Sequence, residues 1–260
     1  MEKHNFKKKF GQNFLQDEGV LINIVNSFSI SENDLIIEVG PGAGALTKYL
    51  KKLECQILAY EIDNSLTSTL KPLEDDKLKI VFKDFMEANL ELDLKEYNYE
   101  NLYLVANLPY YITTPILEKV MESNVKFKEV IVMVQDEVAK RLTSDAGSRE
   151  FGAFTVLLDC FYKRKYLFFV NRNAFYPVPN VDSAVMKLSL KNDLIINDYD
   201  MFKKFVFDCF KFKRKNLKNN LKGYDLDKID SILKNYNLNL NNRAEEVNTN
   251  IFVEIFNSLK

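Results

Sequence analysis

The stretch with the clearest chemical use is an Asn-Leu-Pro-Tyr sequence that directly follows the apolar run 102–106. We predict a buried strand that ends in a stiff loop, because Pro109 fixes its own φ and drives Leu108 towards an extended conformation. The amide oxygen of Asn107 and the carbonyl of Leu108 can then each accept one N–H of an exocyclic amine. Tyr110 can stack on the ring that carries this amine. The alternative is an ordinary Asn-Pro turn at the end of a strand.

A glycine-rich loop follows a second apolar strand, predicted over 35–39. Glycines there allow a ligand to approach the backbone closely, and Glu61, about 20 residues further on, suits a ribose diol. The third glycine comes one residue too early for the Gly-x-Gly-x-x-Gly fingerprint of dinucleotide-binding proteins. Pro41 also separates Gly40 from Gly42, which weakens the expected preference for a pyrophosphate. The alternative is a tight strand-to-helix turn that binds nothing.

Asp84 ends a further predicted strand and could accept a hydrogen bond from an adenine amino group. The alternatives are an exposed acid or a helix cap. Strands are predicted at 35–39, 56–60, 78–82, 102–106 and 129–134, and helices lie between several of them. This alternation predicts a parallel sheet with right-handed crossovers, in which the candidate residues gather at the carboxyl ends of the strands. An amphipathic helix is expected over 18–28, before the first of these strands.

Two basic segments stand out in a chain whose net charge is only −1. One opens the chain and includes Lys8 and Lys9. The second lies in the acid-free window 209–224, which we expect to be part of a helix over 201–221. Its aromatic neighbours favour a phosphate-binding surface, and the alternative is a solvated face. The residues assigned to this second RNA-binding segment are Lys211, Lys213, Arg214, Lys215 and Lys218.

Composition excludes several kinds of chemistry. The chain of 260 residues has 47% apolar content, enough for one large domain and a small appendage. His4 is its only histidine, so a histidine-based triad or a zinc site of the His-Glu-x-x-His type is excluded. Three widely spaced cysteines suit a reducing cytosol. No apolar run approaches the length of a membrane span, and the first residues are not typical of a signal peptide. We therefore expect a cytoplasmic protein without a membrane partner.

Six segments in order resemble the motifs of the ribosomal RNA adenine dimethyltransferases, and the small-subunit branch of that family matches best. The resemblance covers about residues 6–190 and continues more loosely through 212–217 and 243–247. The segments are 12–15 (Gln-Asn-Phe-Leu), 38–44 (Glu-Val-Gly-Pro-Gly-Ala-Gly), 60–63 (Tyr-Glu-Ile-Asp), Asp84, 107–110 (Asn-Leu-Pro-Tyr) and 175–184 (Phe-Tyr-Pro-Val-Pro-Asn-Val-Asp-Ser-Ala).

The resemblance implies S-adenosylmethionine as cofactor and an α/β fold with a Rossmann-like sheet whose last strand is antiparallel. It implies a catalytic domain at 1–190, with a basic segment at 1–17, and a small helical RNA-binding domain at 191–260. Phe175 and Tyr110 would sandwich the target base beside Asn107, and Asp84 would hold the adenine amine of the cofactor. The full implied set is Asn107, Leu108, Pro109, Tyr110 and Phe175 for catalysis, and Gln12, Asn13, Leu15, Gly40, Gly42, Glu61, Ile62, Asp84, Phe85 and Asn107 for the cofactor.

The implied reaction transfers methyl groups to the 6-amino groups of two adjacent adenines in the 3′-terminal hairpin of 16S ribosomal RNA. The implied partner is the small ribosomal subunit, and a monomer is expected. Three alternatives stay open: a large-subunit (23S) resistance methyltransferase, a nicotinamide oxidoreductase, and a non-catalytic RNA-binding assembly factor on the same scaffold. A nicotinamide oxidoreductase would need a Tyr-x-x-x-Lys or histidine proton donor, and this sequence has none in a suitable place.

Overall fold

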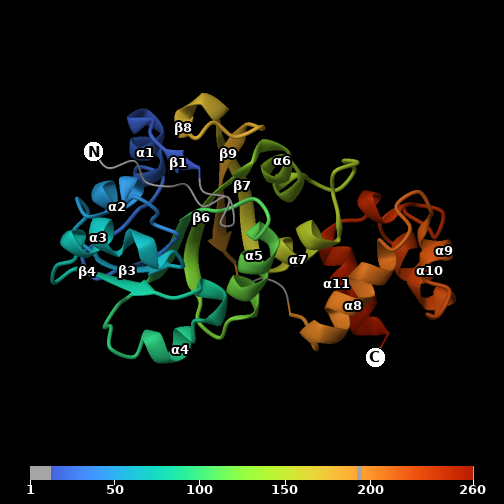
Figure 1. The fold of residues 1–260 in the computed structure, drawn as a ribbon. Coiled ribbons are helices and arrows are strands. Elements are labelled where there is room, and N and C mark those ends of the chain that lie inside the picture. Colours follow the sequence, from blue (N-terminus) through green and yellow to red (C-terminus); the bar gives the residue numbers. More distant parts are fainter. Residues whose placement is uncertain (1–12, 192–194, 260) are drawn as a thin grey trace. The chain divides into compact units, whose positions relative to one another are not determined.

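The computed structural model describes residues 13–191 and 195–259 and groups the chain into two compact units (Figure 1). The first unit consists of residues up to Ala139 together with Lys165–Leu190, and the second of Lys140–Arg164 together with the chain from Lys191 onwards. The larger sheet has the strands β2 (Leu35–Val39), β3 (Gln56–Glu61), β4 (Leu78–Phe82), β5 (Leu102–Asn107), β6 (Phe127–Gln135), β7 (Tyr162–Val170) and β9 (Ser183–Leu190).

This sheet has the order β4-β3-β2-β5-β6-β9-β7. The pairs from β4 through β6 are parallel, and β9 runs antiparallel to β6. Val39 pairs with both Tyr60 and Ala106, so β2, β3 and β5 end at the same edge. Loops that follow these strands therefore meet at one edge of the sheet, as a doubly wound fold requires. The prediction of a Rossmann-like, mostly parallel sheet with an antiparallel last strand is confirmed.

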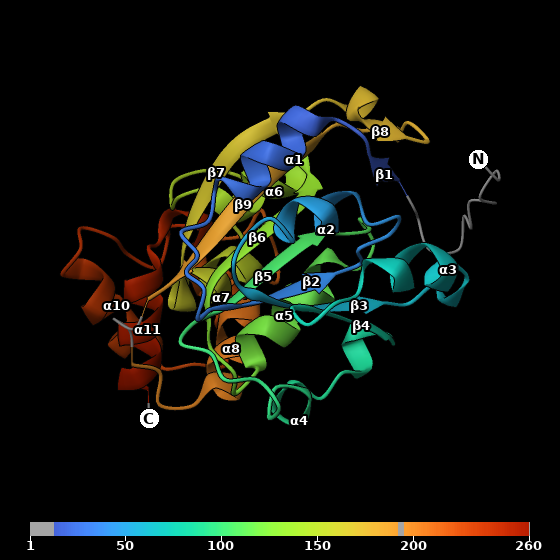
Figure 2. The same ribbon diagram turned by 90° about the vertical axis from the view of Figure 1, so that its left-hand side faces the viewer.

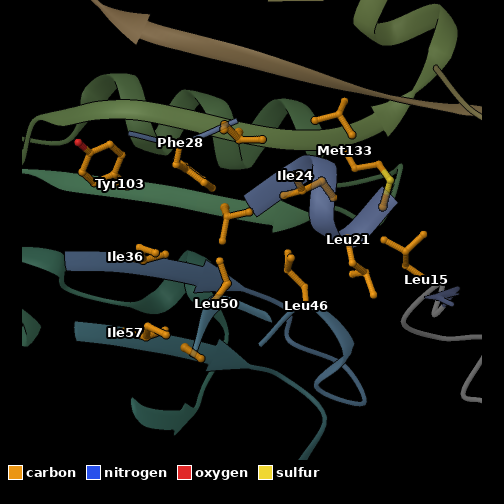
Figure 3. Packing of buried hydrophobic residues seen from close by; sticks show 14 of the residues in the cluster. Leu15, Leu21, Ile24, Phe28, Ile36, Leu46, Leu50, Ile57, Tyr103 and Met133 are labelled. Carbon is orange, nitrogen blue, oxygen red and sulfur yellow. The ribbon is translucent and has the colours of Figure 1, made fainter. Parts of the chain in front are cut away.

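One face of the sheet is covered by α1 (Glu18–Val25), α2 (Ala45–Leu50) and α3 (Thr67–Leu70). Leu21 and Ile24 of α1 and Leu46 and Leu50 of α2 belong to the same buried cluster as Ile36 of β2 (Figure 3). Side chains at alternate strand positions point to this face, which is why Ile57, Tyr103 and Met133 join the cluster. Helix α1 ends at Val25, three residues before the predicted end.

The opposite face is covered by α4 (Leu90–Asp93) and α5 (Thr113–Glu122) (Figure 2). Helix α5 follows the Asn-Leu-Pro-Tyr loop directly and buries Ile116, Leu117 and Val120. A two-stranded antiparallel ribbon joins β1 (Phe14–Leu15) to β8 (Phe175–Tyr176), with Leu15 opposite Phe175. Segments 160 residues apart are thereby held side by side near the start of α1.

The second unit is helical apart from the first residues of β7. Its helices are α7 (Ala153–Phe161), α8 (Tyr199–Cys209), α9 (Leu217–Asn220), α10 (Leu226–Lys234) and α11 (Thr249–Ser258), and α6 (Asp136–Thr143) crosses the boundary between the units. Aromatic rings form its centre: the ring centroid of Phe202 lies 5.4 Å from that of Phe256, and Phe205 lies 5.9 Å from the same ring.

The structure divides the chain differently from the expected ranges 1–190 and 191–260, because residues 140–164 group with the C-terminal helices. Contacts with the C-terminal residues explain this grouping: the N–H of Gly147 donates to the carbonyl of Glu245, and the ring of Phe161 lies 5.3 Å from that of Tyr199. Arg164 holds the segment itself together. Its guanidinium pairs with Asp159 at 3.0 Å and donates hydrogen bonds to the carbonyls of Leu142 and Ser144. These contacts tie α6, α7 and the start of β7 together.

The helix expected over 201–221 is interrupted, and this part of the prediction is wrong. Helix α8 ends at Cys209, and the next helix begins at Leu217. Asn220 accounts for the break, because its amide donates to the carbonyl of Cys209 at 2.7 Å and its oxygen accepts from the N–H of Phe212. The side chain thus satisfies backbone groups that a continuing helix would have paired internally. The basic residues 211–215 lie in the resulting loop.

Candidate cofactor and substrate site

One cavity at the carboxyl edge of the sheet brings together most of the residues predicted from the sequence. From the predicted set it contains Asn13, Leu15, Gly40, Gly42, Glu61, Ile62, Asn107, Leu108, Pro109, Tyr110 and Phe175. The cavity is also lined by Phe14, Ile24, Glu38, Pro41, Ala43, Ala45 and Leu46. Gln12, Lys8 and Lys9 lie outside the described residues.

The glycine loop has the left-handed backbone that glycine favours. Gly40, Gly42 and Gly44 have φ values of 71°, 58° and 77°. A Cβ on Gly42 would lie 2.9 Å from Cε1 of Phe14, so the loop and the N-terminal segment approach each other as closely as a glycine allows. The N–H of Gly42 donates to Oε2 of Glu61 at 3.0 Å. Loop, acid and N-terminal segment therefore form one connected wall of the cavity.

Gly42→Ala is expected to destabilise the fold by about 1–2 kcal/mol through its left-handed backbone and to weaken cofactor binding because Phe14 must move. Gly147→Ala is a matched control, since Gly147 has φ of 95° and no atom within 4 Å of an added Cβ. The control should lose stability in urea unfolding and keep the wild-type affinity for S-adenosylmethionine in calorimetry. Equal affinities of Gly42→Ala and wild type would show that the loop does not contact the cofactor.

Glu61 is buried, with 3% of its surface exposed, and both of its carboxylate oxygens are held. Oε1 accepts from the N–H of Asp63 at 2.8 Å, and Oε2 accepts from Gly42. Burial raises the pKa of Glu61, and these backbone hydrogen bonds oppose that shift. Each oxygen keeps a second lone pair, so the fixed carboxylate can still accept hydroxyl donors. Ile62, next in the chain, lines the cavity with 43% of its surface exposed, which suits contact with a flat ring.

Asn107 ends β5 with its side chain in a defined orientation. Its Nδ2 donates to the carbonyl of Asn13 at 3.3 Å, which leaves the amide oxygen as the acceptor on the other side of the group. The N–H of Leu108 donates to Met133 on the neighbouring strand, and the carbonyl of Pro109 accepts from Ile112. These bonds fix the backbone on both sides of the Leu108 carbonyl. The two acceptors expected from the sequence therefore lie in one rigid loop that lines the cavity.

Tyr110 and Phe175 line the same cavity, although they lie 65 residues apart in the sequence. The hydroxyl of Tyr110 is 3.0 Å from Oγ of Ser183, which fixes the direction of its ring. Burial raises the pKa of Tyr110, so this phenol stays neutral near pH 7. Phe175 is positioned by the pairing of β8 with β1. Two aromatic rings thus accompany the acceptors of the Asn-Leu-Pro-Tyr loop.

Asp84 and Phe85 are not among the residues that line this cavity. Oδ1 of Asp84 accepts from the N–H of Met86 at 2.8 Å, so Asp84 caps the 3-10 helix Phe85–Glu87, as one of the sequence alternatives anticipated. The Phe85 ring is buried and packs edge-on against Tyr60, with their centroids 5.5 Å apart. Asp84 still follows β4 at the same sheet edge as Glu61, whose partner on β4 is Phe82.

Glu38 is the cavity residue whose importance the sequence reasoning missed. It was recognised as part of a motif, but no role was assigned to it. The available signal was a carboxylate within the otherwise apolar strand 35–39, directly before the glycine loop. Phe14 and Pro41 also belong to motifs without an assigned ligand contact. Ile24 has no sequence signal, since an apolar residue in a cavity wall is indistinguishable from ordinary core.

The fold and the cavity are those of a Rossmann-like methyltransferase, with a buried acid at the end of the second strand of the sheet and an Asn-Leu-Pro-Tyr loop at the end of the fourth. Comparison with known sequences assigns the family within that class. The ribosomal RNA adenine dimethylase family matches residues 3–260, and the chain belongs to this family. It is therefore an S-adenosylmethionine-dependent adenine dimethyltransferase of ribosomal RNA, which confirms the activity and cofactor expected from the motifs.

Several relatives carry the name "Ribosomal RNA small subunit methyltransferase A". The protein from Mycoplasma mobile is 40% identical over 98% of this chain and 99% of its own length. The protein from Fusobacterium nucleatum is 40% identical over 96% of each chain, and one from Streptococcus thermophilus is 36% identical over 100% and 94%.

Two solved structures share the fold over nearly the whole chain. A dimethyladenosine transferase from Plasmodium falciparum has a TM-score of 0.81 at 23% identity, covering 94% of this chain and 96% of its own. The 23S rRNA methyltransferase ErmE has a TM-score of 0.75 at 25% identity, covering 95% and 99%. The architecture is therefore common to a dimethyladenosine transferase and a 23S rRNA methyltransferase.

Proposed function

We propose that this enzyme transfers methyl groups from S-adenosylmethionine to the 6-amino groups of two adjacent adenines in the 3′-terminal hairpin of 16S ribosomal RNA. The observation that carries the proposal is the cavity that holds Asn107, Leu108, Tyr110 and Phe175 together with Glu61. The choice of RNA is supported by the relatives at 36–40% identity, all of which are named for the small subunit.

The chain offers a set of groups that fits the cofactor. S-adenosylmethionine, when bound, supplies an electrophilic methyl group on a sulfonium sulfur. Glu61 would accept the ribose hydroxyls, and Gly40 and Gly42 would allow the methionine portion to approach the backbone. Asn13 and Leu15 would close the cavity from the N-terminal segment, where Gln12 would also act. Ile62 and Phe85 would flank the adenine ring, and Asp84 would accept a hydrogen bond from its amine.

The target adenine would contact two hydrogen-bond acceptors and two aromatic rings. Its amine is a weak nucleophile because the nitrogen lone pair is delocalised into the ring. The amide oxygen of Asn107 and the carbonyl of Leu108 would each accept one N–H and draw the nitrogen towards a pyramidal geometry. Tyr110 and Phe175 would stack on the two faces of a base that has left its helix. The methylated nitrogen is acidic enough to lose its proton to water, so orientation and electrostatic fit suffice without a histidine.

A second candidate is methylation of 23S ribosomal RNA, since ErmE has the same fold. Its identity of 25% is well below the 36–40% of the small-subunit relatives, which favours the 16S substrate. A non-catalytic assembly factor is disfavoured because Asn107, Leu108 and Glu61 line one cavity. The described residues contain no helix that could span a membrane. We propose that the enzyme acts as a monomer in the cytoplasm.

Methylation of isolated subunits tests this function. The protein should be incubated with labelled S-adenosylmethionine and small subunits that lack the modification, and the labelled nucleotides should then be mapped. Label in two adjacent adenines near the 3′ end of 16S RNA is the expected result. Label found only in 23S RNA of matched large subunits would establish the second candidate, and no label in either RNA would favour the assembly factor.

The basic residues of the second unit are proposed to contact RNA phosphates. Lys211, Lys213, Arg214, Lys215 and Lys218 are all exposed in the described structure. Phe212 is exposed beside them, with the ammonium of Lys211 5.7 Å from its ring centroid. Because residues 211–215 lie in a loop, their side chains can spread over several phosphates. Lys8 and Lys9 are proposed as a further contact at the N-terminus.

Changing Lys213, Arg214 and Lys215 together to alanine is expected to weaken binding to the immature small subunit. Each lost phosphate contact should reduce the slope of log affinity against log salt by about 0.7–0.9, and we expect one to three contacts to be lost. Binding should be measured at several salt concentrations, and cofactor affinity should not change. A triple change of Lys95, Lys126 and Lys228, which are exposed outside the cluster, removes the same charge and serves as control. Parallel plots of log affinity against log salt for the wild type and the variant would show that the cluster has no role in RNA binding.

A further inference from the structure

Glu38 is a buried carboxyl group in the cofactor cavity. It belongs to β2, directly before the glycine loop, and 1% of its surface is exposed. Its Oε2 has no hydrogen-bond partner among the described residues. The hydroxyl of Thr47 on α2 lies close enough to favour the charged carboxylate but makes no hydrogen bond of ordinary geometry to it. A native fold rarely leaves a buried carboxylate oxygen unpaired, so this atom suggests that a ligand completes its environment.

None of the described residues that line the cavity around Glu38 carries a positive charge. The cavity residues contributed by α1 and α2, such as Ile24 and Leu46, are apolar and belong to the cluster on this face (Figure 3). Strand β5 contributes the neutral amide of Asn107, and the loop after it contributes the neutral phenol of Tyr110. Strand β3 contributes Glu61, the one further carboxyl group among the residues that line the cavity.

These surroundings favour the neutral carboxylic acid while the cavity is empty. Burial is the larger cause and the field of Glu61 the smaller, and together they raise the pKa of Glu38 to about 8, although Thr47 acts in the opposite direction. Glu61 has the backbone N–H groups of Gly42 and Asp63 to stabilise its charge, whereas Oε2 of Glu38 has none. These backbone donors favour ionisation of Glu61 before that of Glu38.

We propose that binding of S-adenosylmethionine is coupled to ionisation of Glu38, which releases one proton to solvent. The cofactor carries a sulfonium, an ammonium and a carboxylate group, so it brings a net positive charge into a cavity where Glu61 is already engaged by two backbone donors. Glu38 is the remaining group that can balance this positive charge, and its O–H bond is the one that breaks. The inference rests on the proposed function, because it takes S-adenosylmethionine as the ligand.

Proton release can be measured without turnover. Calorimetric titration of the full-length protein with S-adenosylmethionine should be repeated at pH 6.5 in buffers of different ionisation enthalpy. This pH lies below the pKa of an α-amino group, about 7.7–8.0, so the ligand keeps its charge. The slope of observed enthalpy against buffer ionisation enthalpy gives the number of protons released. We expect about one proton for the wild type, and a slope of zero would overturn the proposal.

Two variants assign the proton to its residue. Glu38→Gln should bind with a slope close to zero, whereas Glu61→Gln should bind more weakly and still release about one proton. Proton release that persists in Glu38→Gln would overturn the assignment of the proton to Glu38. If this variant does not fold, the slope for the wild type still tests whether binding releases a proton. Binding without proton release would refute the coupling and leave the methyltransferase function standing. A wild-type protein that does not bind S-adenosylmethionine would refute both.

Discussion

Asn107→Ala is expected to reduce methyl transfer about 10²–10³-fold while changing cofactor affinity by only a modest factor. The estimate follows from the cost of removing one fixed hydrogen-bonding group that acts on the reacting atoms. The lost amide oxygen would act mainly on the target amine, whereas the amide nitrogen of Asn107 donates a hydrogen bond to the carbonyl of Asn13 within the protein. Single-turnover methylation of small subunits, with the cofactor saturating, measures the chemical step directly.

Asn124→Ala is a suitable control, because Asn124 is an exposed asparagine beyond the end of α5. It should methylate at the wild-type rate. A near-normal rate for Asn107→Ala would remove this residue from the reaction, and the two acceptors would then have to be sought elsewhere in the loop. A large loss of cofactor affinity instead would make Asn107 a binding residue.

Glu61→Ala is expected to weaken S-adenosylmethionine binding by about 1–3 kcal/mol, which is a factor of about 5–150 in the dissociation constant. The ribose hydroxyls would lose a charged acceptor. The N–H groups of Gly42 and Asp63 would also lose their partner, so the glycine loop should become less ordered. Calorimetry measures the affinity, and protection of the Gly42 amide from hydrogen exchange reports on the loop.

Glu61→Gln separates the two effects. Glutamine keeps one acceptor oxygen for the loop and removes the charge, so we expect an affinity between those of Glu61→Ala and the wild type. An unchanged affinity in both variants would mean that the cavity binds its ligand without Glu61. Another residue at the same sheet edge would then have to accept the hydrogen bonds of the ribose hydroxyls.

Local sequence determined most of the strands and the principal motifs of this protein. The strand 78–82 was predicted with the bounds that the structure has, because short apolar runs rich in β-branched residues have few alternatives. The alternation of strands and helices predicted the parallel sheet and hence the common edge of Gly40, Glu61 and Asn107. The resemblance to a methyltransferase family then pointed to the cofactor.

Tertiary structure alone decided the details that depend on distant contacts. Asn220 interrupts the expected helix by bonding to Cys209, which no local pattern of 209–221 reveals. Residues 140–164 group with the C-terminal helices through contacts such as Gly147 with Glu245 and Phe161 with Tyr199. The state of Glu38 was equally hidden, because a carboxyl group is ordinary in a sequence and acquires its raised pKa only when the sheet and α2 remove water from it and Glu61 lies nearby. Burial is a property of the assembled cavity, and for that reason the sequence could supply this acid but not its protonation.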